Sequence, residues 1–247
     1  MPRTSTPSHL SRRRQARAFT LIELLVVMAI IAILMSIMVP VVGAIRNRGN
    51  QTTSINNLKQ WGTALNSSMA DFDGTLPSDG VSGGATDLTD TDAWFNRLAS
   101  YVGEKPLSDP ETAAKPPKAG DKSVWINPAV PVAEGKSAVP FLFCYAMNDY
   151  LSTTTAKTIK VSRVERNAAT VFMAERADGV ASITPGEVRT FFGGGDSRTA
   201  QDGEANFLFL DGHVVAMKRK IFLNPDALKK EPIDPSYTFI PYPDVEL

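Results

Sequence analysis

The stretch Arg17-Ala-Phe-Thr-Leu-Ile-Glu-Leu-Leu25 decides the organisation of this chain, because a basic segment meets an apolar one within it. On its carboxyl side, Leu24–Val42 holds 19 consecutive positions without a formal charge, most of them Leu, Ile, Val, Met or Ala. A helix rises about 1.5 Å per residue, so such a segment spans roughly 28 Å, close to the hydrocarbon thickness of a bilayer. No later segment is comparably apolar. The sequence therefore predicts one membrane-spanning helix near the N-terminus.

The charges around this segment predict its orientation. Residues 1–18 contain five arginines and no Asp or Glu. Basic residues beside a span favour the cytoplasmic side, so we expect a cytoplasmic N-terminus and everything after Val42 on the outer face. Arg46 and Arg48 on the far side weaken this asymmetry without reversing it. A secretory signal peptide would have a shorter apolar region followed by a small-residue cleavage site, so we expect processing before the apolar block.

Composition excludes several function classes. Beyond residue 18 the chain has 21 basic and 26 acidic residues, a mildly acidic balance that gives no reason to expect nucleic-acid binding. His9 and His213 are the only histidines, which excludes a His-rich zinc site. Cys144 is the only cysteine and lies in an apolar run, so no intrachain disulfide forms and we expect the thiol to be buried. We expect no metal and no cofactor.

The opening stretch resembles the type IV prepilin processing signal: a basic leader, a small residue, then Phe-Thr-Leu-Ile-Glu at the start of an apolar helix. The resemblance implies that a membrane-embedded prepilin peptidase cleaves between Ala18 and Phe19 and that the new amino group of Phe19 is N-methylated. The family usually has Gly before the cut, and Ala18 is a conservative departure from that pattern. The order of leader charge, small residue, Phe, Glu and uncharged block makes this short motif specific.

Glu23 is the most informative single residue. A carboxylate buried at the bilayer centre costs roughly 2.5 to 3.5 kcal/mol, and less near the interface, so such residues are usually functional and paired. The resemblance implies that Glu23 serves in assembly, its partner being the Phe19 ammonium of a neighbouring subunit. The alternative is that Glu23 only extends to the lipid headgroups.

The helix is expected to continue into the exported part. Pro40 removes one backbone hydrogen bond and is expected to kink or loosen it, or to mark the end of the span. Beyond Gly49 an apolar stripe with alternating steps of three and four predicts an amphipathic helix packed on a domain: Ile55, Leu58, Gly62, Leu65, Met69 and Phe72. The turn residues of Asp71–Pro77 end the helix.

The remainder predicts loops followed by a sheet. Residues 78–140 are rich in Gly, Pro, Ser and Asp and are interpreted as a long surface loop with one short helix at Asp92–Val102. The expected strands are Val139–Tyr145, Thr170–Glu175, Glu187–Phe192, Asn206–Leu210 and His213–Met217. Asp211-Gly212 between the last two predicts a hairpin in which both turn residues have positive φ.

That hairpin also resembles a C-terminal element of prepilin-like proteins in which a His precedes Asp-Gly by ten positions. Counting back from Asp211 gives Gln201, so the hairpin matches the element and its first position does not. The role of that histidine therefore does not transfer, and the hairpin is interpreted as architecture.

Together these features predict an α+β, pilin-like fold in which a long N-terminal helix packs on a C-terminal antiparallel sheet. The expected parts are a leader at 1–18, a transmembrane and assembly helix at 19–45, and an exported domain at 46–247. The predicted function is non-enzymatic: a subunit of a type IV pilus or of a type II secretion pseudopilus, between which the sequence does not choose. Its expected partners are prepilin peptidase, other pilin or pseudopilin subunits and the inner membrane. The alternative is a membrane-anchored, exported ligand-binding protein that uses this signal for export only.

Overall fold

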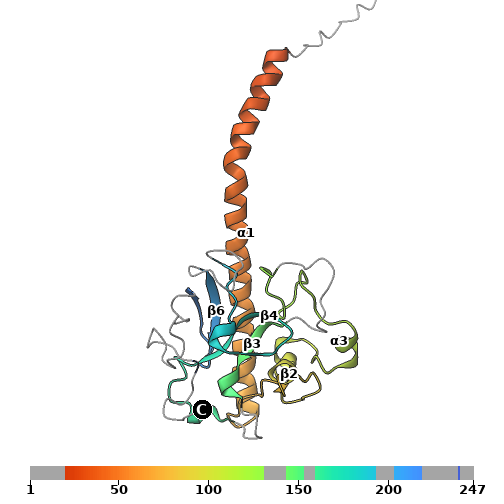
Figure 1. The fold of residues 1–247 in the computed structure, drawn as a ribbon, viewed down its shortest axis with the longest axis vertical. Helices are drawn as coiled ribbons and strands as arrows, with labels where there is room; N and C mark the ends of the chain where they lie inside the picture. The colour runs from red at the N-terminus through yellow and green to blue at the C-terminus, as the bar shows by residue number, and fades with distance from the viewer. Residues whose placement is uncertain (1–19, 131–142, 153–158, 193–202, 219–238, 240–247) are drawn as a thin grey trace, which may run out of the picture. The chain divides into compact units, whose positions relative to one another are not determined.

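The computed structural model describes residues 20–130, 143–152, 159–192, 203–218 and 239. By contacts the chain divides into two compact units, Met1–Ile45 and Arg46–Leu247. Helix α1 (Leu21–Asp71) contributes to both (Figure 1). The helix ends at the predicted turn, and it runs through position 40 without a break. A proline removes one helical hydrogen bond, and the bonds of the adjoining turns keep the helix intact.

The second unit consists of short helices and a sheet, which makes the fold α+β and pilin-like, as predicted. After α1 the elements are β1 (Val81–Ser82), β2 (Ala85–Thr86), α2 (Trp94–Arg97), η1 (Ala99–Val102), α3 (Pro110–Ala114), β3 (Phe143–Asn148), η2 (Asp149–Leu151), η3 (Val161–Arg163), β4 (Val171–Asp178), β5 (Ser182–Ile183), η4 (Pro185–Glu187), β6 (Glu204–Phe209) and β7 (Val214–Lys218).

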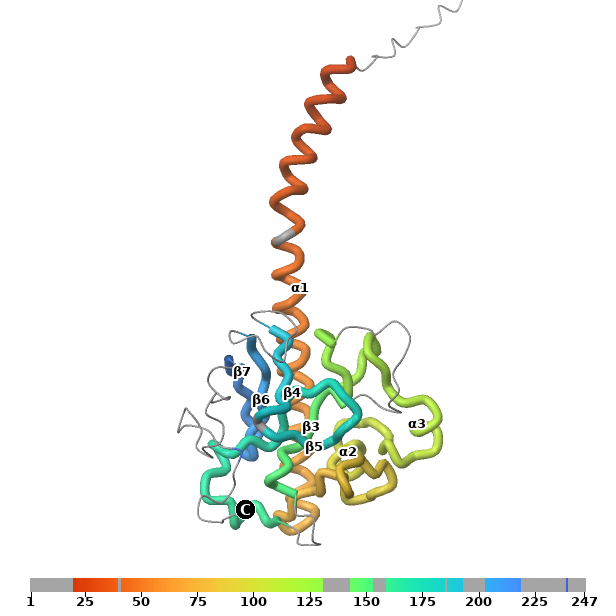
Figure 2. Tube along the Cα trace, viewed as in Figure 1, coloured from red at the N-terminus to blue at the C-terminus, as the bar shows by residue number. Residues whose placement is uncertain are grey.

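Five strands form the main sheet in the order β5-β3-β4-β6-β7 (Figure 2). All neighbours are antiparallel except β3 and β5, which are parallel. The expected strand at Glu187–Phe192 is wrong, because Glu187 ends the 3₁₀ turn η4 and Phe192 forms only an isolated bridge to Glu204. The Thr184 backbone N–H and hydroxyl both donate to the Glu187 carboxylate at 2.8 Å, and this capping box favours the turn over an extended strand.

The predicted hairpin is present, with a different turn. Only Gly212 has a positive φ, at 92°, whereas Asp211 does not. The Gly212 N–H donates to the Phe209 carbonyl at 2.9 Å, and the Phe209 N–H donates to the His213 carbonyl at 3.0 Å. A type I turn followed by one left-handed residue has this pattern, and it needs glycine only at the last turn position.

The distal part of α1 packs on this sheet, because its apolar side chains share one cluster with residues of β3, β4 and β6. Its buried face is centred on Leu58, Trp61 and Leu65, all with no exposed surface. Phe72, expected on the same face, is 47% exposed and lies under the Arg97 guanidinium, 3.9 Å from its ring centroid. The predicted stripe is therefore correct in its middle and wrong at its C-terminal end.

The largest correction concerns residues 78–140, which were interpreted as surface loop. Much of the described part is core: Trp94 and Trp125 are 1% and 2% exposed. Their rings pack around Trp61 with centroid distances of 5.4 Å and 4.7 Å. The Trp61 indole N–H donates to the Val124 carbonyl at 3.3 Å, and that of Trp94 to Ala181 at 3.0 Å. The short helix α2 and the irregular segment around Trp125 thus supply two of the three tryptophans at the centre of the domain.

A second apolar cluster lies on the opposite face of the sheet. Adjacent residues of β6 belong to opposite faces of the sheet: Leu208 lies in the apolar cluster that includes α1, and Phe207 lies in the second cluster. The second cluster includes Phe239, which is 5% exposed and contacts Phe207 edge to face at 6.2 Å. The Asn148 side chain donates to the Phe239 carbonyl at 2.7 Å. One residue of the C-terminal segment therefore completes this face.

Candidate functional site

The start of α1 is built around Thr20 and Glu23. The Thr20 backbone N–H and hydroxyl donate to the same Glu23 carboxylate oxygen at 2.9 Å and 2.8 Å. The Glu23 N–H donates back to the Thr20 hydroxyl at 3.3 Å. This is a capping box, which satisfies backbone donors that a helix leaves free at its first turn and places a negative charge at the positive end of the helix dipole. The predicted cleavage residues Ala18 and Phe19 lie outside the described residues.

The apolar part of α1 has no cover within its own unit. Its large side chains are all exposed, from 45% at Ile31 to 81% at Leu21. Within the described residues, α1 is the single helix long and apolar enough to cross a membrane. Apolar surface of this extent requires lipid or other apolar helices around it. One N-terminal apolar helix of this kind fits membrane anchoring.

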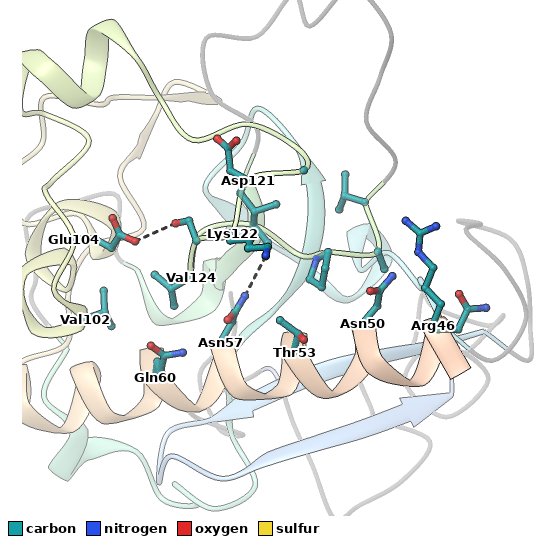
Figure 3. A pocket seen from close by; sticks show the side chains of 17 residues that line it. Arg46, Asn50, Thr53, Asn57, Gln60, Val102, Glu104, Asp121, Lys122 and Val124 are labelled. Atoms are coloured by element: carbon teal, nitrogen blue, oxygen red, sulfur yellow. Dashed lines mark hydrogen bonds between the residues drawn. The ribbon is translucent and has the colours of Figure 1, made fainter. Parts of the chain in front are cut away.

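A polar groove of about 950 Å³ lies within the second unit, along one side of α1 (Figure 3). Its helical wall consists of Arg46, Asn47, Asn50, Thr53, Asn57 and Gln60, and its opposite wall of segment 120–130 with Val102 and Glu104. One hydrogen bond joins the two walls, because Asn57 donates to the Ile126 carbonyl at 3.0 Å. A second lies within the opposite wall, where Ser123 donates to Glu104 at 3.1 Å.

The groove offers hydrogen bonds without a net charge. Asn47 and Asn50 present carboxamides that have no hydrogen-bond partner among the described residues. Arg46 and Lys122 are balanced by Glu104 and Asp121. Such a lining fits neutral polar groups, and the volume falls within the range of small-molecule sites. The sequence analysis did not identify this groove, because its two walls are about 40 or more residues apart along the chain and its asparagines form no known motif.

A second feature absent from the sequence analysis is the buried carboxyl of Glu175 on β4. It is 0% exposed and accepts hydrogen bonds from α1, from segment 123–130 and from β6. Burial raises the pKa of Glu175 to about 7, and the hydrogen bonds from Ser54, Asn206 and Asn127 oppose that rise. In the sequence Glu175 is one of 26 acidic residues and the end of a predicted strand, and no pattern distinguishes it.

His213 and Cys144 are the histidine and the cysteine in the described part of the chain. His213 stacks on Phe209 with ring centroids 4.3 Å apart, and its Nδ1 lies 2.5 Å from an Asp211 carboxylate oxygen. Cys144 is fully buried, as predicted, and burial raises the pKa of its thiol to about 12. No group of three or more His, Cys, Asp or Glu in the described part of the chain could hold a metal ion. Gln201 lies outside the described residues.

Comparison with protein families gives one match, to the prokaryotic N-terminal methylation motif over residues 13–39. The matched range contains the Thr20–Glu23 capping box and most of the exposed apolar part of α1. No curated protein and no solved structure matches the chain. The motif and the α+β architecture agree with each other, and the motif supports a prepilin-type protein.

Proposed function

We propose that this protein is a structural subunit of a type IV pilus or of a type II secretion pseudopilus. The observation that carries the proposal is an exposed apolar helix that begins with a carboxylate, within a prokaryotic N-terminal methylation motif. Such a helix anchors the subunit in the membrane before assembly and packs against the helices of other copies afterwards. The same apolar surface serves both states, because lipid and neighbouring helices are similarly apolar.

Processing precedes assembly in this proposal. Prepilin peptidase removes residues 1–18 by cleaving between Ala18 and Phe19, and the free amino group of Phe19 is methylated. Residues 19–45 then hold the protein in the inner membrane, with the N-terminus on the cytoplasmic side. Residues 46–247 form the exported domain. The arginines of the leader support this orientation, because positive charge favours the cytoplasmic side.

Glu23 has two candidate roles that substitutions can separate. Within the chain it caps α1 through Thr20. Between chains it neutralises the Phe19 ammonium of the neighbouring subunit, which removes two isolated charges from an apolar environment. A glutamine in the same place can still take part in a capping box but carries no charge.

The test compares Glu23→Gln with Thr20→Ala in an assembly assay that measures the fraction of protein in sheared filaments or overexpressed pseudopili. We expect Glu23→Gln to remain in the membrane fraction and to be lost from filaments. Thr20→Ala removes a cap worth about 1 kcal/mol, keeps the charge and should still assemble. Incorporation of Glu23→Gln at the wild-type level would refute the intersubunit pairing.

The second candidate function is an anchored, exported binding protein, and the polar groove along α1 favours it. In that case the signal serves export only, and Glu23→Gln leaves the activity of the exported domain intact. A substitution in the groove that leaves filament incorporation unchanged but abolishes a cellular phenotype would favour binding over a purely structural role. Asn50→Ala suits this purpose, because Asn50 lines the groove and has no partner among the described residues.

A further inference from the structure

The helical wall of the groove is a row of polar side chains on one face of α1. Its five main members share that face because alternating steps of four and three separate them along the chain. They are Arg46, Asn50, Thr53, Asn57 and Gln60 (Figure 3). A helix rises about 1.5 Å per residue, so the row is about 21 Å long. An extended polypeptide advances about 3.3 Å per residue, and roughly six of its residues would therefore lie along this row.

The hydrogen-bonding groups of this row match those of a polypeptide backbone. Asn47 and Asn50 line the groove without a hydrogen-bond partner among the described residues, and they are neighbours on the helix because they are three positions apart. A carboxamide carries an N–H donor and a C=O acceptor side by side, the same two groups that a peptide unit offers. Each of these side chains can therefore bond one peptide unit of an extended chain, whatever the side chains of that chain are.

The opposite wall offers small aliphatic surface. Its apolar members are Val102, Val124, Ile126, Pro128, Ala129 and Val130. Alternate side chains of an extended peptide point to the same side, so they would pack on this surface while the backbone faces the helix. None of the described residues that line the groove is aromatic. A sugar ring needs a broad, flat apolar surface against its C–H face, so this lining favours a peptide over a saccharide.

Charges of opposite sign stand at the two ends of the groove. Arg46 lies at one end and Glu104 at the other (Figure 3). Glu104 accepts a neutral hydroxyl, that of Ser123, at 3.1 Å, and neither charged side chain forms an ion pair with a described residue. Asp121 and Lys122 are adjacent and of opposite sign, so they add no net charge between the two ends. A complementary peptide is therefore acidic at its Arg46 end and basic at its Glu104 end.

We propose that the groove binds an extended segment of another polypeptide, about six residues long, through its backbone. The carboxamides of Asn47 and Asn50 bond peptide units of that segment, and the two end charges select a segment with one acidic and one basic end. This inference rests on the second candidate function, in which the exported domain binds a ligand, and names the chemical class of that ligand. It does not require the chain to assemble into filaments.

The test measures equilibrium binding of a dye-labelled hexapeptide to the full chain in detergent micelles by fluorescence anisotropy. The probe has capped ends, a lysine first, an aspartate last, and alternating valine and alanine between them. We expect saturable binding that Asn50→Ala weakens by about 3- to 10-fold, the value of one or two lost hydrogen bonds. Asn56→Ala is the matched control, because Asn56 is exposed on the same helix and does not line the groove, and its affinity should be unchanged. Absence of saturable binding, or equal affinity in Asn50→Ala and Asn56→Ala, would overturn the proposal.

A charge exchange tests the orientation of the ligand. Replacing the aspartate of the probe with a second lysine places a cation against Arg46, and we expect the wild-type protein to bind this peptide about fivefold more weakly. Arg46→Glu should reverse the preference, so that the two-lysine peptide binds better. Arg46 is exposed, so the substitution leaves the core intact. The same preference in the wild-type protein and in Arg46→Glu contradicts the proposed end contact.

Two competitors identify the class of ligand. A probe with N-methylated central peptide bonds lacks backbone donors, and we expect it to compete at least about tenfold more weakly than the unmodified probe. A neutral glucose hexamer should not displace the peptide. Equal competition by the methylated probe, or displacement by the sugar, would refute backbone recognition. These assays involve no filament, so their failure removes the peptide site and leaves the subunit proposal, which the Glu23→Gln assembly assay tests separately.

Discussion

Replacing Gly62 with alanine tests how closely α1 is seated on the hairpin. An ideal Cβ at this position would lie 2.8 Å from Leu208 Cδ1 and 3.2 Å from both the Cα and the carbonyl oxygen of Gly212. Leu208 is fully buried, and Gly212 holds its turn with a positive φ, so neither neighbour moves freely. The methyl group must therefore displace the helix or the hairpin by several tenths of an ångström.

Two opposing effects set the magnitude. Alanine is better than glycine in a helix by about 1 kcal/mol. Overpacking a filled core costs about 1 to 3 kcal/mol, and contacts of this closeness against backbone belong to the upper part of that range. We therefore expect Gly62→Ala to lower the free energy of unfolding by about 1 to 2 kcal/mol.

Gly49 provides a matched control in the same helix. No atom lies within 4 Å of a Cβ built there, so Gly49→Ala gains the helical preference without the clash. We expect it to raise the free energy of unfolding by about 0.5 to 1 kcal/mol. Urea unfolding of the full chain in detergent, monitored by the fluorescence of the buried tryptophans, measures both variants. If Gly62→Ala is as stabilising as Gly49→Ala, the helix does not lie against the hairpin at the described spacing.

Three further outcomes follow from the packing. Trp125→Ala should cost about 3 to 5 kcal/mol, because it leaves a cavity beside Trp61 at the centre of the core, and thermal unfolding would show the loss; a cost below about 1 kcal/mol contradicts this packing. Phe239→Ala should cost about 3 kcal/mol, because its ring completes the second apolar cluster, and should leave membrane insertion unchanged, as fractionation would show. Cys144 should resist thiol reagents at pH 8 in the folded protein and react after denaturation, as mass spectrometry would detect, because the thiol is buried and its pKa is raised to about 12.

The sequence was sufficient where a local pattern has a single physical meaning. The uncharged block predicted a membrane-length helix, and Asp211-Gly212 predicted the hairpin because few other residues suit that turn. The sequence did not predict the type of turn, because a two-residue loop and a longer loop can both have Gly at this position. The helix also continued through Pro40, because one missing hydrogen bond does not end a helix supported on both sides.

Sequence reasoning failed where burial depends on contacts between distant segments. Trp125 lies in a Pro- and Gly-rich region without periodicity, and Trp94 begins a helix of only four residues, so no local pattern marked either residue as core. The groove and the hydrogen-bond cluster around Glu175 are also assembled from distant parts of the chain. The N-terminal motif differs from these, because the residues around Glu23 are continuous in sequence and recognisable without the fold.

The most direct test of the prepilin assignment is the intact mass of the protein extracted from membranes. The account predicts a single species that begins at Phe19 and carries one added methyl group, and fragmentation should place that methyl on the N-terminal amine. Ala18→Arg should prevent cleavage and leave the leader attached, which controls for unspecific proteolysis. A mature chain that retains Met1, or one that begins beyond Val42 and is found free of the membrane, would contradict the account.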